Sequence, residues 1–205
     1  MDQLFNIVVM LPLFIYLEAY LEIKPVVVEV ALIPSLETCL VQFFIMLFME
    51  DFFFFSTHVA FHTKAFYKYH KVHHDDKTTT TLTGFRGHNV EMVAQVILPA
   101  LVFMKVASCY APLHVSTIVI FQIFRLCEGN NSHSGYNFSW TLLGVLPFAT
   151  SEGYHDFHHS HNVGNYASMF RLWDTLFDTN RWYKKYDKAR EAKMTAALEL
   201  DEKEE

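Results

Sequence analysis

Eight histidines occur in three clusters whose spacings match one face of a helix. His58 and His62 are four residues apart, and an H-x-x-H-H spacing then occurs twice further along the chain. Side chains three or four residues apart on an α-helix project from the same face, and imidazole is the commonest metal ligand in proteins. The spacings therefore predict a metal centre whose ligands are His58, His62, His70, His73, His74, His155, His158 and His159.

The first five clustered histidines also predict a direction of projection. On one unbroken helix their side chains would fall at about 0, 40, 120, 60 and 160 degrees, so that all five point into one half-space. An isolated histidine is more often satisfied by hydrogen bonds than by a metal. We therefore expect a structural role for His114, and we expect His161, about 60 degrees outside the arc of the third cluster, to lie outside the ligand set.

The number of clustered histidines indicates two metals. A structural zinc site closes with four ligands and a catalytic one usually has three, so eight ligands exceed the needs of a single ion. Imidazole suits iron, zinc, copper and nickel, and the ligand type alone does not choose among them. The sequence has no H-E-x-x-H motif, which excludes the usual helical zinc-protease signature.

The composition indicates a folded protein with extensive apolar surface. Of 205 residues, 52% are hydrophobic and 19% are charged, and the net charge is -6. This excludes a disordered chain and argues against nucleic-acid binding, because no basic excess is available to neutralise phosphates. The three cysteines are far apart and form no C-x-x-C pair, so a disulfide framework is not expected.

Long apolar runs must position the histidines. Residues 4–20 and 39–55 are candidate membrane spans, and residues 92–106 with 113–124 suit a membrane hairpin or a re-entrant pair joined at 107–112. We expect an all-α integral membrane protein with about four transmembrane or re-entrant helices and a cytosolic, histidine-rich helical cap. The first run lacks a basic n-region and a cleavage site, so it is expected to be retained. Apolar helices in the core of a soluble protein are the alternative.

The distribution of positive charge predicts the orientation. All but Lys24, Lys105 and Arg125 of the 16 lysines and arginines lie in residues 57–91 and 128–205, which carry the histidine clusters. By the positive-inside tendency these stretches and the C-terminus face the cytosol. The N-x-S sequons at Asn130 and Asn137 are then expected to stay unglycosylated.

The chain is expected to have three parts. Residues 1–56 form N-terminal membrane helices, and residues 57–180 form the histidine-bearing domain, which includes the membrane hairpin 92–127. Residues 181–205 alternate in charge and are expected to form a solvated charged helix or tail without chemistry of its own.

Longer motifs around the histidines resemble those of the membrane fatty acid hydroxylase and sterol desaturase superfamily, and within it those of the 4-methylsterol oxidases. The likeness covers about residues 58–180. It rests on FYKYHKVHH at 66–74, HNVE at 88–91, HSGYNF at 133–138, HDFHH at 155–159 and GNYASMFRLWDTLFDT at 164–179. Together these motifs are far more specific than any single histidine pattern.

The resemblance implies a di-iron enzyme of the endoplasmic reticulum membrane that oxidises a lipid C–H bond with molecular oxygen. It adds His88 and His133 as provisional metal ligands. It also implies supporting positions around the metals at Glu91, Tyr136, Asn137 and Trp173. The chain has no G-x-G-x-x-G fingerprint, so electrons are expected from an external donor. The resemblance suggests a cytochrome b-type protein or its reductase.

The function that these features favour is a methylsterol monooxygenase reaction, oxidation of the 4-methyl group of a 4-methylsterol in sterol biosynthesis. A sterol desaturase or a fatty acyl or sphingolipid hydroxylase of the same superfamily remains an alternative. An alternative of another class is a non-catalytic membrane protein that binds metal or lipid. The catalytic residues beyond the metal ligands, the exact lipid and the oligomeric state stay open.

Overall fold

The fold is helical. The computed structural model describes Tyr16 and residues 26–136, 138, 141, 144, 146 and 148–204. Within these residues two isolated β-bridges are the only extended pairings. The elements are η1 (Val30–Leu32), α2 (Leu36–Phe61), α3 (Tyr67–His70), η2 (His73–Asp75), η3 (Thr83–Phe85), α4 (Asn89–Met92), η4 (Val93–Ile97), α5 (Leu98–Tyr110), α6 (Val115–Ser132), α7 (Glu152–His161), α8 (Leu172–Leu176) and α9 (Arg181–Glu204).

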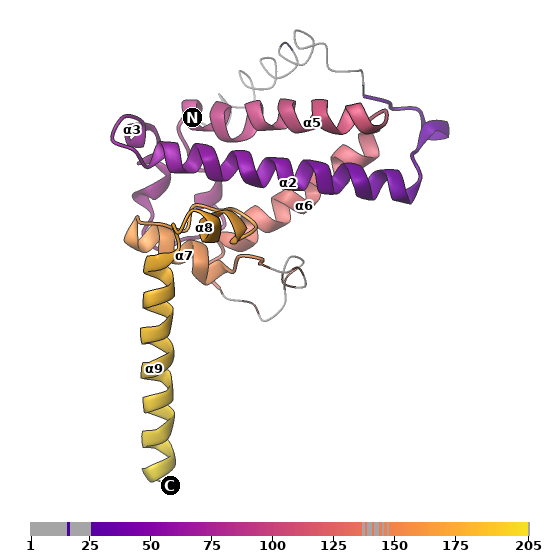
Figure 1. The fold of residues 1–205 in the computed structure, drawn as a ribbon. Helices are drawn as coiled ribbons and strands as arrows, with labels where there is room; N and C mark the ends of the chain where they lie inside the picture. The colour runs from indigo at the N-terminus through magenta and orange to yellow at the C-terminus, as the bar shows by residue number, and fades with distance from the viewer. Residues whose placement is uncertain are drawn as a thin grey trace.

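Two helices in the described part of the chain are long and apolar enough to cross a membrane. They are α2 and the continuous helix Asn89–Tyr110, which comprises α4, η4 and α5. These two helices lie side by side, and α6 runs from near the end of α5 diagonally past α2 toward α7 (Figure 1). The apolar part of α6 does not meet the same criterion. The expected span at residues 4–20 lies outside the described residues except for Tyr16, so a total of four spans stays a prediction.

The helical hairpin expected in this region turns later than the sequence indicated. The helix continues through residues 107–110, and the connection to α6 comprises Ala111, Pro112, Leu113 and His114. Ala111 is fully extended, with φ −156° and ψ 162°. The cause is Pro112, because a proline disfavours helical geometry in the residue before it. The expected connection at 107–112 was therefore placed too early.

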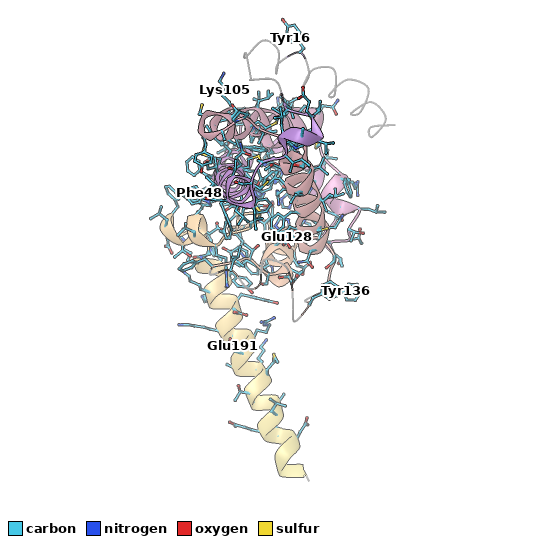
Figure 2. The ribbon with its side chains drawn as sticks, turned by 90° about the vertical axis from the view of Figure 1, so that its right-hand side faces the viewer. Tyr16, Phe48, Lys105, Glu128, Tyr136 and Glu191 are labelled. Atoms are coloured by element: carbon cyan, nitrogen blue, oxygen red, sulfur yellow. The ribbon has the colours of Figure 1, made fainter. Side chains whose placement is uncertain are left out.

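Helix α2 combines an apolar outer face with a partly polar inner face. It begins where the Ser35 hydroxyl accepts a hydrogen bond from the Thr38 N–H at 3.2 Å. Phe44 and Phe48 lie on an exposed, open apolar groove between α2 and α5, and Figure 2 shows Phe48 at the outer edge of the bundle. The same helix also carries two buried carboxylates, Glu50 and Asp51. Exposed phenylalanines beside buried carboxylates are what a lipid-facing helix with polar inner contacts requires.

A wide π-helical turn interrupts the second long helix at Val93–Ile97. Its cause is Pro99, which lacks the N–H that an α-helix would direct to the carbonyl of Gln95 and whose ring crowds that carbonyl. Such π-turns relieve a broken α-helical ladder and often occur at functional sites. The turn therefore sets the direction of the Gln95 side chain.

Apolar packing joins the bundle into one core. Met46 and Leu47 of α2 pack with Phe103 and Met104 of α5 and with Phe121 of α6. These side chains are at most 4% exposed. Burying a large apolar side chain contributes roughly 1.5–3 kcal/mol. The core thus fixes the ends of α2 and α6 from which the histidines project.

The cap lies at one end of the bundle and is made of α3, α7, α8 and the loops between them (Figure 1). Helix α7 ends at Asn162, which adopts a left-handed conformation with φ 54°. Helix α9 projects away from the cap and presents side chains such as Glu191 to its surroundings (Figure 2). The charged C-terminal segment is therefore a helix.

Candidate metal centre

Nine histidines meet in two compact groups. The ligand atoms within each group all lie within 4.8 Å of one another. The first group comprises His58, His62, His70, His74 and His158, and the second comprises His73, His133, His155 and His159. All eight clustered histidines predicted from the sequence are included, together with the provisional ligand His133.

Each H-x-x-H-H motif is divided between the two groups. In the earlier motif His70 and His74 enter the first group while His73 enters the second. In the later motif His158 enters the first group while His155 and His159 enter the second. Both motifs therefore contribute to both groups, and this places the two groups beside each other.

The helix that carries the first histidines is broken. Helix α2 ends at Phe61, residues 63–66 form a turn, and His70 and His73 then belong to two short helices, α3 and η2. The expectation of five histidines on one unbroken helix is wrong. The turn reverses the chain, and the ring of His70 consequently packs against both His58 and His62 at centroid distances of 4.8 Å.

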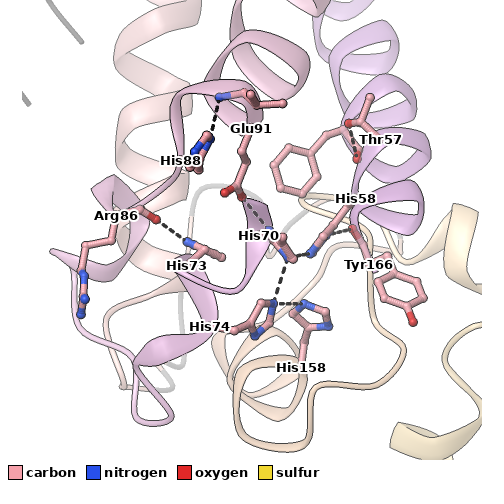
Figure 3. A network of polar contacts seen from close by, with 12 residues as sticks. Thr57, His58, His70, His73, His74, Arg86, His88, Glu91, His158 and Tyr166 are labelled. Carbon is pink, nitrogen blue, oxygen red and sulfur yellow. Dashed lines mark hydrogen bonds and ion pairs between the residues drawn. The ribbon is translucent and has the colours of Figure 1, made fainter. Parts of the chain in front are cut away.

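Hydrogen bonds to Nδ1 orient the rings of the first group. The Nδ1 atom lies 2.8 Å from the Tyr166 carbonyl oxygen in His58, 2.6 Å from the Gly164 carbonyl oxygen in His158, and 2.7 Å from Glu91 Oε1 in His70. Figure 3 shows the contacts of His58 and His70. Because these oxygens accept, each Nδ1 carries the proton and each Nε2 presents a lone pair.

The second group is oriented in the same way. His73 Nδ1 lies 2.9 Å from the Arg86 carbonyl oxygen (Figure 3), and His133 Nδ1 lies 2.9 Å from the Gly129 carbonyl oxygen at the end of α6. His159 is fully buried, and neither of its ring nitrogens has a hydrogen-bond partner among the residues that the structure describes. A buried imidazole without partners is costly unless a ligand supplies the missing contact.

The Nε2 atoms face one another at distances that suit a shared metal. His58 Nε2 and His70 Nε2 lie 3.0 Å apart, although the Nδ1 contacts leave a lone pair on each. Lone pairs this close repel unless a cation lies between them. Two ligands held at right angles about 2.1 Å from one metal would stand about 3.0 Å apart. The separation recurs in the second group between His155 Nε2 and His133 Nε2, at 3.0 Å.

Burial keeps these histidines neutral. Desolvation, with smaller contributions from neighbouring histidines, lowers the pKa of His62 to about 3 and that of His159 to about 2. Desolvation likewise lowers the pKa of His70 and of His133 to about 4. Neutral imidazole is the form that binds metal ions. Both groups are thus suited to hold a metal at neutral pH.

Buried carboxylates fix the loop that orients His58. Asp174 accepts hydrogen bonds from the backbone N–H groups of Tyr166 and Ala167, each at 2.9 Å, and from the Tyr154 hydroxyl at 2.8 Å. Asp174 is fully buried. It therefore holds the peptide segment whose Tyr166 carbonyl receives the His58 N–H.

A second carboxylate attaches the same loop to α2. Asp51 accepts from the Met169 N–H at 2.8 Å and from the Trp173 indole N–H at 2.9 Å. Trp173 was expected beside the metals, and its indole N–H instead contacts Asp51 of α2. The sequence offered a signal for this contact, since an Asp in the middle of an apolar run has to find a buried partner.

The remaining histidines lie outside both groups. His88 caps α4, with its Nδ1 accepting from the Val90 N–H at 3.1 Å (Figure 3), and its ring packs on Tyr69. His114 caps α6 through the Ser116 N–H, and the ring of His161 stacks on a phenylalanine.

The other expected supporting residues differ in position. Glu91 is buried and contacts His70, as described above. Tyr136 is 71% exposed and Figure 2 shows it at the molecular surface. Asn137 lies outside the described residues.

Comparison with known proteins identifies the family. The family model of the fatty acid hydroxylases matches residues 43–179, more than half of the chain. The methylsterol monooxygenase erg25B of Aspergillus fumigatus is 33% identical over 165 residues, covering 79% of this chain and 55% of that protein. The C-4 methylsterol oxidase erg25 of Schizosaccharomyces pombe is 32% identical over 173 residues, covering 83% and 56%.

The relatives are not uniform in activity. The very-long-chain aldehyde decarbonylase GL1-11 of Oryza sativa is 36% identical over 144 residues, covering 66% of this chain and 51% of that protein. The chain spans about half of the length of these curated relatives. No solved structure gives a significant match. The matched region contains every histidine of both groups, and the chain belongs to the fatty acid hydroxylase family.

Proposed function

We propose that this chain oxidises the 4-methyl group of a 4-methylsterol, using two iron ions and molecular oxygen. The observation that carries the proposal is the pair of adjacent, all-histidine groups with Nε2 atoms facing inward. Methylsterol monooxygenases among the relatives support the choice of substrate. A hydroxylation of this kind inserts one oxygen atom into a C–H bond and reduces the other to water, consuming two electrons and two protons.

Some residues of this chain would hold the metals, and others orient the histidine rings. The five histidines of the first group would hold one iron and the four of the second group the other. Glu91 and the carbonyls of Tyr166 and Gly164 orient three of the rings. Bound iron would supply the oxidising power that no ordinary side chain has for breaking an unactivated C–H bond.

The buried position of the site excludes water. His74, His158 and His159 are at most 2% exposed. Exclusion of water strengthens electrostatic interactions inside a site and prevents loss of the oxidant to side reactions. The packed cap thus protects the chemistry, while the membrane side of the centre adjoins the apolar bundle from which a lipid would enter.

Electrons would come from a separate protein. The sequence contains no dinucleotide fingerprint that would hold a nicotinamide or flavin. We assign the donor role to a cytochrome b-type protein or its reductase, docking on the cap from the cytosol. In this arrangement the bundle lies in the endoplasmic reticulum membrane, and the histidine groups and α9 face the cytosol.

The decisive experiment measures metal and turnover together. The full chain is expressed in a host that lacks its own sterol methyl oxidase, purified without oxygen, and assayed for metal content. It is then given a 4,4-dimethylsterol, a reducing system and oxygen. About two irons per chain with oxygen-dependent loss of the methyl C–H would support the proposal. Less than one bound metal after anaerobic purification would overturn it.

The aldehyde decarbonylase relatives define a second candidate, because their identity to this chain is as high as that of the sterol enzymes. The same preparation is offered a very-long-chain aldehyde, a fatty acyl lipid and a sphingoid base. Two bound irons with conversion of one of these, and none of the sterol, would reject the sterol substrate and retain the two-metal centre. Two bound metals without any turnover would favour a non-catalytic binding protein.

A further inference from the structure

A half-open cavity of about 140 Å³ lies between α2, η4, α5 and α6. Its walls include Phe54, Phe103 and Phe121, and its polar lining consists of Glu50, Gln95 and Arg125. A pocket for a whole small molecule usually measures about 300–1,000 Å³. The cavity therefore has room for one end of a lipid, and its mixed lining suits an end that carries a polar group.

The cavity lies near the first histidine group on two of the helices that line it. On α2, Phe54 precedes His58 by four residues and their rings are in contact at 5.2 Å. On the second long helix, Gln95 follows Glu91, the partner of His70, by four residues. A helical turn rises about 5.4 Å. A group bound in the cavity is therefore close to the metals.

The third helix places the second histidine group further away. Arg125 of α6 lies four residues before Gly129, whose carbonyl oxygen accepts from His133, so Arg125 and His133 are about two helical turns apart. The cavity is therefore nearer to the first histidine group than to the second.

Two buried polar atoms in the lining lack hydrogen-bond partners within the part of the chain that the structure describes. Arg125 donates to Glu50 Oε1 at 2.7 Å, and this leaves Glu50 Oε2 buried without a hydrogen bond. The amide nitrogen of Gln95 is also buried without a partner. Glu50 is 7% exposed and Gln95 is 6% exposed. Unpartnered buried polar atoms are rare in folded proteins because each one costs free energy.

One unused acceptor and one unused donor match a hydroxyl group. A hydroxyl donates one hydrogen bond and accepts others, whereas a carboxylate or a ketone could not satisfy Glu50 Oε2. We propose that the cavity binds the hydroxyl end of a lipid substrate, with the Gln95 amide donating to the hydroxyl oxygen and the hydroxyl donating to Glu50. Arg125 fixes the Glu50 carboxylate in place.

The proposal rests on the proposed function and extends it to substrate positioning. In a 4-methylsterol the ring carbon that bears the hydroxyl is bonded directly to the carbon that bears the methyl group. Anchoring the hydroxyl one turn from the histidines would therefore hold the neighbouring methyl group toward the metals. The apolar ring system would extend along the phenylalanine walls.

The π-turn explains why Gln95 is available. In a regular α-helix the side chain of residue 95 would take a different direction, and Pro99 prevents that regular helix. The Gln95 amide thus points into a mostly apolar bundle because the π-turn interrupts the α-helical hydrogen bonds at this position.

The test is equilibrium binding to the full chain loaded with zinc, which is redox-inactive and so prevents turnover. Three probes are compared: a 4,4-dimethylsterol with its free hydroxyl, the same sterol with the hydroxyl removed, and its methyl ether. Dissociation constants come from competition against the tritium-labelled free sterol. We expect the free sterol to bind at least about tenfold more tightly than the deoxy probe, with the ether between them.

Variants then assign the preference to Gln95. Gln95→Met keeps about the size of the side chain and removes its donor, so it should reduce the preference for the free sterol over the deoxy probe at least about threefold, while the hydroxyl can still donate to Glu50. The matched control is Gln122→Leu, because Gln122 also lines the cavity but is exposed. It should keep the wild-type preference. Metal content is measured on each variant to confirm that the centre is intact.

Several results would overturn the inference. Equal binding of the three probes by the wild type would mean that the cavity holds water or nothing. Absence of saturable sterol binding would also reject it, as would an equal loss of affinity for all probes in Gln95→Met. Failure of the proposed function looks different: the iron-loaded chain would leave the sterol unoxidised while the hydroxyl preference persisted in the zinc-loaded chain.

Discussion

The Nδ1 atom of His58 donates to the carbonyl oxygen of Tyr166 over 2.8 Å, and this contact joins the last turn of α2 to a loop 108 residues later. The loop is itself held by Asp174 through two backbone N–H groups and by Asp51 through a third. The orientation of the His58 ring, a proposed metal ligand, thus depends on carboxylates that do not touch the histidine groups. Such outer contacts commonly change metal affinity by 10–100-fold.

The substitution Asp174→Asn tests this dependence. An amide has one acceptor oxygen in place of two, so it cannot satisfy the N–H groups of Tyr166 and Ala167 as well as the Tyr154 hydroxyl. We expect metal affinity of the first group to fall about 10–100-fold. Bound metal then drops from about two to about one per chain after dialysis at limiting metal, measured by mass spectrometry.

The matched control is Asp178→Asn, four residues later, where the aspartate is exposed and forms a surface ion pair with Arg181 at 3.9 Å. It should retain the wild-type metal content, because exposed ion pairs contribute little. Loss of both metals in Asp174→Asn would indicate unfolding of the whole cap and would contradict a selective positioning role.

Glu91→Gln should weaken the first group more mildly. The Glu91 carboxylate lies 2.7 Å from His70 Nδ1, and a negative acceptor makes the imidazole a stronger metal ligand than a neutral amide does. We expect about tenfold weaker metal binding and a parallel loss of turnover. Glu37→Gln, on the exposed first turn of α2, is the control and should change neither quantity. Unchanged metal affinity in Glu91→Gln would show that the charge of the Glu91 carboxylate does not contribute to metal binding.

Trp173→Phe should destabilise the protein without removing metal. The change deletes the indole N–H that donates to Asp51 at 2.9 Å and leaves a buried carboxylate oxygen short of a partner. Leaving a buried acceptor unsatisfied costs about 1–3 kcal/mol. Thermal unfolding in detergent measures the loss, and Trp182→Phe on α9, where the indole is 40% exposed, is the control. A Trp173→Phe variant that loses its metal but unfolds at the wild-type temperature would contradict this prediction. It would show that Trp173 supports metal binding and not the stability of the fold.

The sequence could predict which clustered histidines come together because their information is local. Spacings of three and four residues on short helices place His155, His158 and His159 on neighbouring faces whatever the rest of the fold does. The division of each motif between two groups could not be read in this way. It depends on the turn after α2, which redirects His70 and His73 and has no strong local signature in residues 63–66.

The sequence also could not predict which oxygen atoms orient the histidine rings. Backbone carbonyls such as those of Tyr166 and Gly164 carry no residue-type signal, and their position is set by contacts distant in the chain. His88 and His133 looked alike as single histidines within family motifs. The structure separates them: His133 follows the last turn of α6 and points into the second group, whereas His88 caps the start of α4.

Metal removal should destabilise the chain in a way that identifies His159. Neither ring nitrogen of this buried histidine has a hydrogen-bond partner in the described part of the chain, and we expect a metal to supply the missing contact. A ligand present at 100 times its dissociation constant stabilises by about 2.7 kcal/mol, and a domain of this size shifts by roughly 2–4 °C per kcal/mol. Dialysis against a strong chelator should therefore lower the unfolding midpoint by about 5–10 °C. His161→Ala, outside both groups, should show the same shift, whereas His159→Ala should show a smaller one because it begins with less bound metal. Equal shifts in all three proteins would mean that His159 contributes nothing to metal binding.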